Sequence, residues 1–533
     1  MIKTARRLIA AATALGLACV LPATGWAQKS GGTLRFPFPD SPPSASIHEE
    51  ATTSTVVPFM GLYNNLVLFD QLLPQNSPET IRPDLAESWK WSDDGRALTF
   101  NLVGNAKWHD GKPFTSADVK CTWDMLSGKT ESKLRRNPRA SWYWNLDGVS
   151  TEGDRQVTFH LKQPQPSLLV LLASGYSPVY PCHVSATQMR TKPVGTGPFK
   201  LAEFKQKEMV RLVRNPDYFK KGKPYLDAIE IPIVPARGTA ILGFVSNRYD
   251  MTAPYFVTIP LLKDVKEQSP QAICETAAMN NNTNLILNRD AAPFNNPDIR
   301  RAMMLAIDRK AFIDILNQGQ AQVGGTMEPG PDGIWGLPTQ IYDTVTGYGP
   351  DVAKNRAEGR ALMEKLGYGP NNRLKLKVST RNHLLYRDPA VILIDQLKEV
   401  YFDGELDLVD TAVWYTKVGR KDYAIGLNTT GNGVDDPDQN FFENFSCSSE
   451  RNYTGYCNAD IEKLFAVQSA ERDVEKRKKL VWEIDRKLLE DGARPVIMWN
   501  AAATCWHPSV KNFRPQVNSL YNGSRFEDVW LDK

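Results

Sequence analysis

The feature that most limits how this chain folds is the alternation of strand and helix patterns over nearly all of its 533 residues. Apolar residues repeat with a period of two at 30–36, at 157–161 and on both sides of a turn within 89–102, which predicts strands and a hairpin. Apolar residues three to five positions apart predict helices, the clearest over 473–490. Because no repeat and no flexible linker separates these segments, the sequence predicts an α/β protein with interwoven domains.

Several of the expected helices have recognisable ends. Thr115 and Asp118 form a capping-box start for a helix that runs to residue 126. Asn296 and Pro297 start a helical run that Gly319 ends. Further helical spacing is found at 53–69, 351–366 and 389–400.

The first 27 residues have the pattern of a secretory signal peptide. Three basic residues precede a mostly apolar stretch at 8–21, and small residues lead to a cleavage position after Ala27. A membrane anchor is one alternative, but the apolar stretch would span only about 21 Å as a helix, against about 30 Å of hydrocarbon. Lipidation at Cys19 is a second alternative, although the apolar Val20 and Leu21 follow this cysteine.

Composition and charge fit an exported globular protein. The chain is 42% hydrophobic and 23% charged, and Lys and Arg exceed Asp and Glu by only 64 − 60 = 4. Nucleic-acid binding would need a clustered basic excess, so no nucleic-acid partner is expected. No stretch after residue 27 is apolar enough to span a bilayer. We therefore expect a soluble monomer in the periplasm of a Gram-negative bacterium.

Six cysteines follow the expected signal peptide, and an even number in an oxidising compartment permits disulfides. Cys447 and Cys457 are the best pair, because they bracket a short polar loop. Zinc binding is the competing interpretation, but no second closely spaced pair of Cys or His completes four ligands. The pairing of the other four cysteines stays open: Cys121, Cys182, Cys274 and Cys505.

The usual sequence motifs of catalysis are absent. The chain has no Gly-x-Ser-x-Gly, Ser-x-x-Lys or His-Glu-x-x-His, and Trp123 stands where a phosphate-binding loop ending at Thr130 would need its first glycine. The histidines are scattered, and turn chemistry explains acidic pairs such as Asp435 and Asp436 at least as well as catalysis does. We therefore expect a binding protein without enzymatic activity, cofactor or metal site.

A series of motifs occurs in one order along the chain. They are LAESW (85–89), SDDG (92–95), LTFNL (98–102), WHDGKPFTSADV (108–119), PVGTGPFK (193–200), RNPDYF (214–219), LILN (285–288), DIRRA (298–302), AIDR (306–309) and, more weakly, DPD (436–438). Together they resemble the extracytoplasmic solute-binding proteins of ABC importers, in the peptide, nickel and opine family known as family 5. Most of these motifs are turns and core positions, so they indicate the fold rather than the ligand.

The resemblance implies an α/β, two-lobed periplasmic-binding-protein fold of the type II kind, a Venus flytrap with an extra inserted domain. Domain I would be discontinuous, and domain II would be inserted beside it in the first lobe, while domain III would form the second lobe. Chain crossings near 279–288 and 498–503 would form the hinge. The limits are 30–70, 198–283 and 503–533 for domain I, 71–197 for domain II and 284–502 for domain III.

Ligand-binding residues are also implied by the resemblance. Peptide-binding members carry an acidic residue just before the Asp-Pro-Asp segment that pairs with the peptide amino group, but Gly433 takes this place here, with Asp435 as the nearest substitute. Arg381 falls near a position that binds a peptide carboxylate, unless it is a solvated charge, and Trp414 matches a cleft tryptophan, unless it is a core aromatic. Trp335 has the same two interpretations. The remaining candidates are expected at the crossings or at the cleft rim: Asn281, Asn282, Asn428, Thr429, Trp499, Asn500, His48 and Glu49.

The function implied is that of a receptor for an ABC importer, which captures a small organic ligand and delivers it to the transmembrane permease subunits. A peptide-like, opine-like or otherwise acidic ligand is expected, with an acidic group near Arg381. A nickel chelate or a sugar is an alternative ligand. A secreted hydrolase with an unrecognised active site, or a binder that never meets a permease, is an alternative function.

Overall fold

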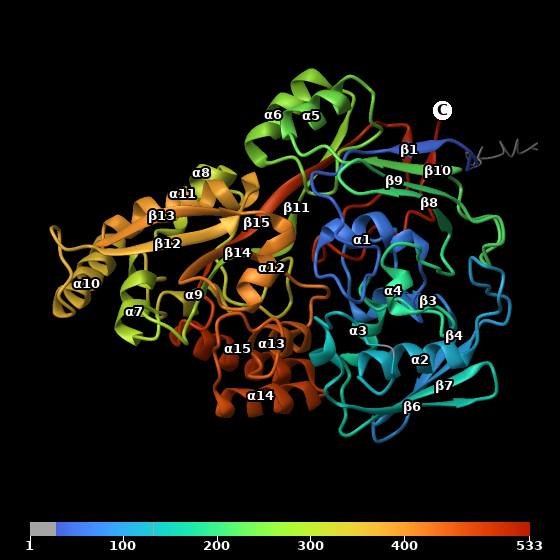
Figure 1. The fold of residues 1–533 in the computed structure, drawn as a ribbon, viewed down its shortest axis with the longest axis horizontal. Coiled ribbons are helices and arrows are strands. Elements are labelled where there is room, and N and C mark those ends of the chain that lie inside the picture. The colour runs from blue at the N-terminus through green and yellow to red at the C-terminus, as the bar shows by residue number, and fades with distance from the viewer. Residues whose placement is uncertain (1–27, 132) are drawn as a thin grey trace, which may run out of the picture.

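The computed structural model describes residues 28–131 and 133–533, so the expected signal peptide and Cys19 lie outside the described residues. Three larger β-sheets organise the fold, two in a first lobe and one in a second lobe (Figure 1). Among the described residues, no helix has the length and apolar character needed to cross a membrane.

The first lobe contains a four-stranded sheet and a second sheet inserted between its segments. The first sheet has the order β1-β10-β9-β8, with β1 parallel to β10 and the other neighbours antiparallel. The inserted sheet has the antiparallel order β4-β5-β7-β6. The strands are β1 (Thr33–Arg35), β4 (Ala86–Trp91), β5 (Ala97–Leu102), β6 (Leu146–Glu152), β7 (Gln156–Leu161), β8 (Phe199–Lys205), β9 (Met209–Arg214) and β10 (Ala228–Pro232).

The pattern of alternating residues explains the inserted sheet. In β5, Leu98, Phe100 and Leu102 are buried while Asn101 is exposed, as a half-buried strand requires. The ring of Trp123, on α2 (Ser116–Leu126), lies 5.0 Å from that of Phe159 on β7 and joins the helix to the sheet. The predicted hairpin and the capped helix start at Thr115 are confirmed.

The second lobe is built on the sheet β13-β12-β14-β11-β15, in which β12 is parallel to both β13 and β14. Helix α11 packs on β12 and β13, and α7 packs on α10. These elements are β11 (Ile273–Leu287), β12 (Leu374–Arg381), β13 (Phe402–Val409), β14 (Ile425–Gly431), β15 (Val496–Trp506), α7 (Pro297–Ala306), α10 (Val352–Lys365) and α11 (Leu384–Lys398).

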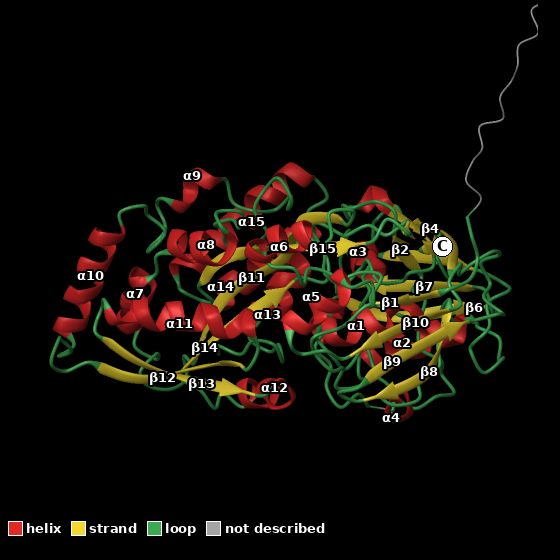
Figure 2. Cartoon of the chain, turned by 90° about the horizontal axis from the view of Figure 1, so that it is seen from above, coloured by secondary structure: helices red, strands yellow, loops and turns green. Residues whose placement is uncertain are grey.

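Two long antiparallel strands, β11 and β15, join the lobes (Figure 1). Seen from above, the first lobe and α10 lie at opposite ends of the molecule, with these strands between them (Figure 2). The register of the pair shifts between Ala278 and Asn282, and Asn280 within this bulge has a positive φ of 37°. The expected crossing at 498–503 falls within β15, and the expected crossing at 279–288 covers the end of β11 and one residue beyond it.

Three C-terminal helices of the second lobe face the inserted sheet of the first. They are α13 (Pro437–Phe445), α14 (Ala459–Ala470) and α15 (Val474–Glu490). Trp144 packs against Phe442 with the ring centroids 4.8 Å apart and the ring planes tilted by 31°, and the Ser167 hydroxyl donates to the buried Asp438 carboxylate over 2.5 Å. Contacts between residues so distant in sequence hold the two lobes together on this side of the molecule.

Shorter elements complete the chain. They are α1 (Thr53–Phe59), α3 (Leu168–Ala173), α4 (Ala186–Met189), α5 (Arg237–Val245), α6 (Ile259–Gln268), α8 (Arg309–Asn317), α9 (Thr339–Tyr342), α12 (Thr411–Gly419), three 3₁₀ turns (Met60–Leu62, Pro78–Thr80, Ala140–Tyr143) and the strands β2 (Val67–Phe69), β3 (Ile81–Pro83), β16 (Val510–Lys511) and β17 (Trp530–Leu531).

All six described cysteines form disulfides. The structure joins Cys447 to Cys457, the pair that the sequence favours. It also joins Cys121 to Cys182, and Cys274 on β11 to Cys505 on β15.

Three helix predictions need correction. The expected helix at 53–69 ends early and gives way to a 3₁₀ turn and β2, because every residue from 54 to 69 is buried and the apolar period carries no information there. The run after Asn296 is two helices, because the backbone is extended at Ile307 and Asp308 then caps the second helix by accepting from the Ala311 amide. Helix α11 begins before Pro389 and contains it.

Candidate functional site

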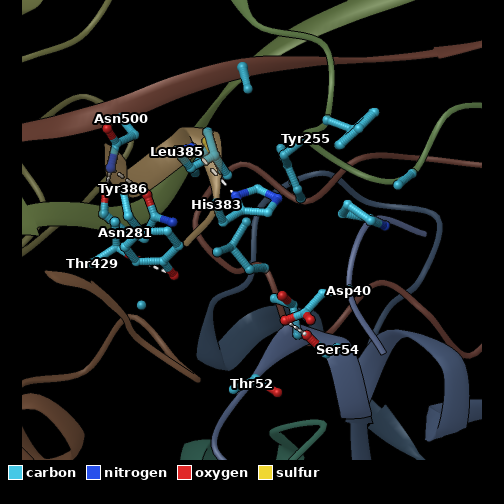
Figure 3. Close-up of a pocket in the computed structure, with 18 of the residues that line it drawn as sticks. Asp40, Thr52, Ser54, Tyr255, Asn281, His383, Leu385, Tyr386, Thr429 and Asn500 are labelled. Atoms are coloured by element: carbon cyan, nitrogen blue, oxygen red, sulfur yellow. Dashed lines mark hydrogen bonds between the residues drawn. The ribbon is translucent and has the colours of Figure 1, made fainter. Parts of the chain in front are cut away.

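A cavity lies between the two lobes and holds about 1440 Å³ of empty space, part of it at its opening to solvent. The first lobe contributes the segments 38–40, 51–54 and 253–256 together with Arg237, and the second lobe contributes residues around the start of α11. The hinge strands form the remaining wall, through Asn281 and Asn500 among others (Figure 3).

Arg381 is the last residue of β12 and lies in the cavity wall with 6% of its surface exposed. Its guanidinium donates to the Asp40 carboxylate of the first lobe over 2.8 Å, to Thr411 over 3.0 and 3.1 Å, and to the Tyr386 hydroxyl over 2.6 Å. Burial opposes the charge, but Tyr386, Tyr415 and Asp40 outweigh it and raise the pKa of Arg381. Arg381 is therefore a permanent cation that an acid of the opposite lobe already neutralises.

The start of α11 places two further polar groups in the cavity. The Tyr386 hydroxyl receives a hydrogen bond from Thr429 on β14 over 2.9 Å (Figure 3). The Nδ1 atom of His383 accepts from the Leu385 amide over 3.3 Å. Burial, followed by the charge of Arg381, lowers the pKa of His383 to about 4, so this ring is neutral at neutral pH.

Hinge asparagines form a connected pair at the back of the cavity. The Asn500 amide donates to the Asn281 side-chain oxygen over 2.8 Å and to its backbone carbonyl over 3.3 Å, while Thr283 donates to the Asn500 oxygen over 3.1 Å. These bonds link β11 to β15 beside the bulge. They hold the side-chain amides of Asn281 and Asn500 in place on β11 and β15, where both line the cavity.

Four of the residues proposed from the sequence are brought together in the cavity wall: Arg381, Asn281, Thr429 and Asn500. The nearby Asn282 and Asn428 do not line it, because successive side chains of a strand point to opposite faces. Asn282 instead accepts from the Asn284 side chain over 2.7 Å.

The three candidate tryptophans are packed elsewhere. Trp414 is fully buried with Ile286, Val418 and other apolar residues beneath the sheet. Trp335 lies in a separate apolar cluster and donates to the Asp435 carbonyl over 3.0 Å. Trp499 donates to the Gly325 carbonyl over 3.0 Å and lines a smaller second cavity.

The remaining candidates are held by protein contacts. A β-carbon added at Gly433 would lie 3.0 Å from both Trp142 and Tyr176, and Gly433 does not line the cavity. The Asp435 carboxylate accepts from the Ile334 amide over 3.2 Å, outside the main cavity.

His48 and Glu49 are buried within the first lobe rather than at the cavity rim. The His48 Nε2 atom donates to the Pro178 carbonyl over 2.8 Å. Glu49 forms a two-bond ion pair with Arg190, at 2.7 and 2.8 Å.

Several cavity residues were not identified from the sequence. Asp40 lies in an irregular segment rich in Pro and Ser, and Arg237, Tyr255, Tyr386 and Tyr521 belong to no motif. No local signal marks these residues, because the cavity forms only when distant segments meet. Among the described residues, no group of three or more His, Cys, Asp or Glu is arranged to hold a metal ion.

Comparison with known proteins places the chain among binding proteins. Residues 80–452 match the family model described as "Bacterial extracellular solute-binding proteins, family 5 Middle". The chain is 25% identical over 512 residues to the oligopeptide-binding protein AppA of Bacillus subtilis, with 92% of this chain and 89% of AppA covered. It is 26% identical over 459 residues to the probable D,D-dipeptide-binding periplasmic protein DdpA of Escherichia coli, with 83% and 84% covered.

Solved structures share the fold. The periplasmic binding protein AgaA of A. tumefacien R10, in complex with agropinic acid, superposes with a TM-score of 0.81 at 22% identity and covers 94% of this chain and 99% of its own. AppA of Bacillus subtilis, in complex with a nonapeptide, gives a TM-score of 0.81 at 22% identity, with 95% and 100% covered. The two-lobed α/β fold expected from the sequence is thereby confirmed.

Proposed function

Because the chain belongs to the bacterial extracellular solute-binding proteins of family 5, we propose that it is a periplasmic receptor of an ABC importer. It captures a small organic ligand between its lobes as a monomer and delivers it to the transmembrane permease subunits. The signal peptide at 1–27 directs its export. N-terminal sequencing of protein from a periplasmic extract should start at Gln28, and a chain that keeps residues 1–27 would contradict this.

The observation that carries the proposal is the cavity lined by both lobes and by the hinge. A ligand that touches both walls binds the closed form better than the open form, and this difference in affinity drives closure. The sheet of β1, β8, β9 and β10 falls within the proposed domain I (30–70, 198–283, 503–533), and the inserted sheet falls within domain II (71–197). The third sheet lies mainly in domain III (284–502), and its strands β11 and β15 cross into domain I, which supports motion of the first two domains against the third.

We propose a peptide-like or opine-like ligand. Relatives named for oligopeptides and dipeptides, and the fold shared with the AgaA complex, support this class. Gly433 carries no carboxylate to pair with an α-amino group at the place that the resemblance to peptide receptors implies. A ligand whose amino group is substituted, as in an opine or an amino-acid conjugate, does not need that partner.

Direct binding tests the proposal. Thermal shift and isothermal titration with agropinic acid, Met-Leu and Ser-Thr-Ser-Ala should identify a binder at one-to-one stoichiometry, with a change in tryptophan fluorescence and no product. Glucose and a nickel–citrate complex test the alternative ligand classes.

Native mass spectrometry of gently purified protein identifies any trapped molecule. Steady product release would instead favour a hydrolase.

A matched pair of variants places the binding in the cavity. Thr429→Phe puts a ring where the hydroxyl contacts Tyr386 and should abolish binding. Thr151→Phe, on an exposed position of β6, should bind like the unmodified protein. Equal binding by both variants would show that the ligand site lies elsewhere.

A further inference from the structure

Three arginines line the cavity, and two of them are already neutralised. Arg381 pairs with Asp40 over 2.8 Å, and Arg451 pairs with the buried Glu443. The side chain of Arg237, the first residue of α5, has neither an ion pair nor a hydrogen bond among the described residues, and its Nε atom is buried without a partner. Its guanidinium lies over the Phe256 ring, 5.3 Å from the centroid.

An unpaired guanidinium in a partly desolvated wall is unfavourable. Burial lowers the pKa of Arg237, and the charge of Asp388 only partly offsets this effect. Asp388 lies on α11, is 48% exposed and pairs with its neighbour Arg387 over 3.4 Å rather than with Arg237. The Arg237 guanidinium therefore lacks an anionic partner within the protein, and a bound ligand could supply one.

The second lobe offers a matching donor. Because the His383 Nδ1 atom accepts from the Leu385 amide, the ring proton lies on Nε2, which has no hydrogen-bond partner in the part of the chain that the structure describes. Burial and the charges of Arg381 and Arg237 lower the pKa of this ring, so it is a neutral donor. All three residues line the same cavity.

We propose that Arg237 is the anion-binding residue of the cavity and that the ligand is an organic acid whose carboxylate binds between Arg237 and His383. The assignment rests on the proposed receptor function. It moves the acidic group away from Arg381, the position expected from the sequence, because Asp40 already occupies that guanidinium. A carboxylate can accept two hydrogen bonds from Arg237 and one from His383, and so would join the two lobes.

Matched acids and amides test the inference. Agropinic acid, Met-Leu and Ser-Thr-Ser-Ala are each compared with the corresponding carboxamide by isothermal titration, on the unmodified protein and on Arg237→Gln. The unmodified protein should bind at least one acid roughly tenfold to a hundredfold more tightly than its amide. Arg237→Gln should remove this difference by weakening the acid alone, and Arg237→Lys should restore part of it.

Arg248→Gln is the matched control, because Arg248 is an exposed arginine just beyond α5 that contacts Tyr249 and does not line the cavity. It should bind acids and amides as the unmodified protein does. Chemical labelling adds a readout that needs no variant. Hydroxyphenylglyoxal should modify Arg237 more than Arg381, and a bound acid should protect it.

Two results would overturn the assignment and leave the receptor function intact: equal binding of acid and amide by the unmodified protein, or unchanged acid affinity in Arg237→Gln. Absence of binding by every probe would overturn the peptide-like or opine-like function, and the assignment would fail with it. Preferential labelling of Arg381 would also contradict the inference.

Discussion

His48 is a neutral residue in the core of the first lobe. Its ring is 1% exposed, donates to the Pro178 carbonyl and packs edge-on against Tyr180 with centroids 4.4 Å apart. Burial lowers the pKa of His48 to about 3, whereas the unfolded chain has a value near 6.5. The folded state therefore binds fewer protons than the unfolded state between these values, and its stability falls as the pH falls from about 6.5 towards 3.

We predict that His48→Gln reduces acid sensitivity. The Gln side chain keeps a donor for Pro178 but does not titrate, so it should remove roughly 2 kcal/mol of the stability loss between pH 6.5 and pH 5. Urea unfolding across this range measures the effect. His160→Gln, at an exposed position bonded to Ser150, should leave the slope unchanged. Parallel profiles for His48→Gln and the unmodified protein would disprove the prediction.

Glu328 is a buried acid beside the hinge. It is 1% exposed, and it lines the second cavity with Asp332. Burial, followed by the charges of Asp435 and Asp332, raises the pKa of Glu328 well above its usual range. Burial likewise raises the pKa of Asp435 to about 7.

Because the folded state favours the protonated acid, stability should fall as the pH rises from about 4.5 through the raised pKa. Glu328→Gln mimics the protonated form, so we expect an unchanged Tm at pH 5 and a Tm several degrees higher than that of the unmodified protein at pH 8. Differential scanning calorimetry at both values checks this. Glu87→Gln, whose side chain is 53% exposed, serves as control. A gain that is equal at both pH values would argue against a titrating Glu328.

The candidate residues show what a single sequence can and cannot give. Arg381 and Asn281 were identified because the family motifs place them near the cleft, and both lie in the cavity wall. Trp414 could not be assigned to cleft or core, since the same indole suits either environment. Arg237 and Asp40 belong to no motif, and they line the cavity only because distant segments of the chain meet there.

At the scale of elements, the hinge pair β11 and β15 is tied by a disulfide. Cys274 and Cys505 lie opposite each other in the strand register and are 231 residues apart in sequence. Cys447 and Cys457 are only 10 residues apart. In the chain-entropy model, closing the long loop stabilises the fold by roughly 5 kcal/mol and closing the short one by roughly 3 kcal/mol.

We therefore predict that the double variant Cys274→Ala/Cys505→Ala loses more stability than Cys447→Ala/Cys457→Ala. Urea unfolding of both variants and of the unmodified protein, under non-reducing conditions, gives the two differences directly. A loss at the short loop that equals or exceeds the loss at the hinge would show that chain entropy is not the main term.

Element boundaries were predictable where caps and a polar face coincide. Helix α15 (Val474–Glu490) matches the expected range, and Asp473 caps it by accepting from the Glu475 and Lys476 amides. The end of α1 was not predictable, because Met60 to Phe69 are buried on all sides and periodicity disappears.

At the scale of the whole molecule, the two lobes meet through contacts that no local sequence pattern predicts. Segments beside the inserted sheet meet α13 through Trp142, whose indole donates to Glu443 over 2.6 Å, and through Ser167, which donates to Asp438. The hinge positions could be expected from the family motifs, whereas these side-chain pairs join residues about 300 positions apart.

One interlobe pair lies in the cavity itself. Asp40, whose side chain is 24% exposed, accepts from Arg381 over 2.8 Å and from Ser54 over 3.0 Å. In Asp40→Asn, Arg381 keeps its charge but loses its partner across the cleft, so the ligand-free closed form should be weakened by about 1–2 kcal/mol, less than for a fully buried pair. This shifts the ratio of closed to open molecules roughly tenfold.

Small-angle scattering of ligand-free protein measures this shift as a larger radius of gyration for Asp40→Asn than for the unmodified protein. Asp70→Asn is the matched control, because Asp70 pairs with Arg82 over 3.3 Å within the first lobe. Its scattering should be unchanged. Adding a ligand that contacts both lobes should return Asp40→Asn to the compact profile, since the ligand replaces the lost link. Identical profiles for all three ligand-free proteins would mean that the Asp40–Arg381 pair does not contribute to closure.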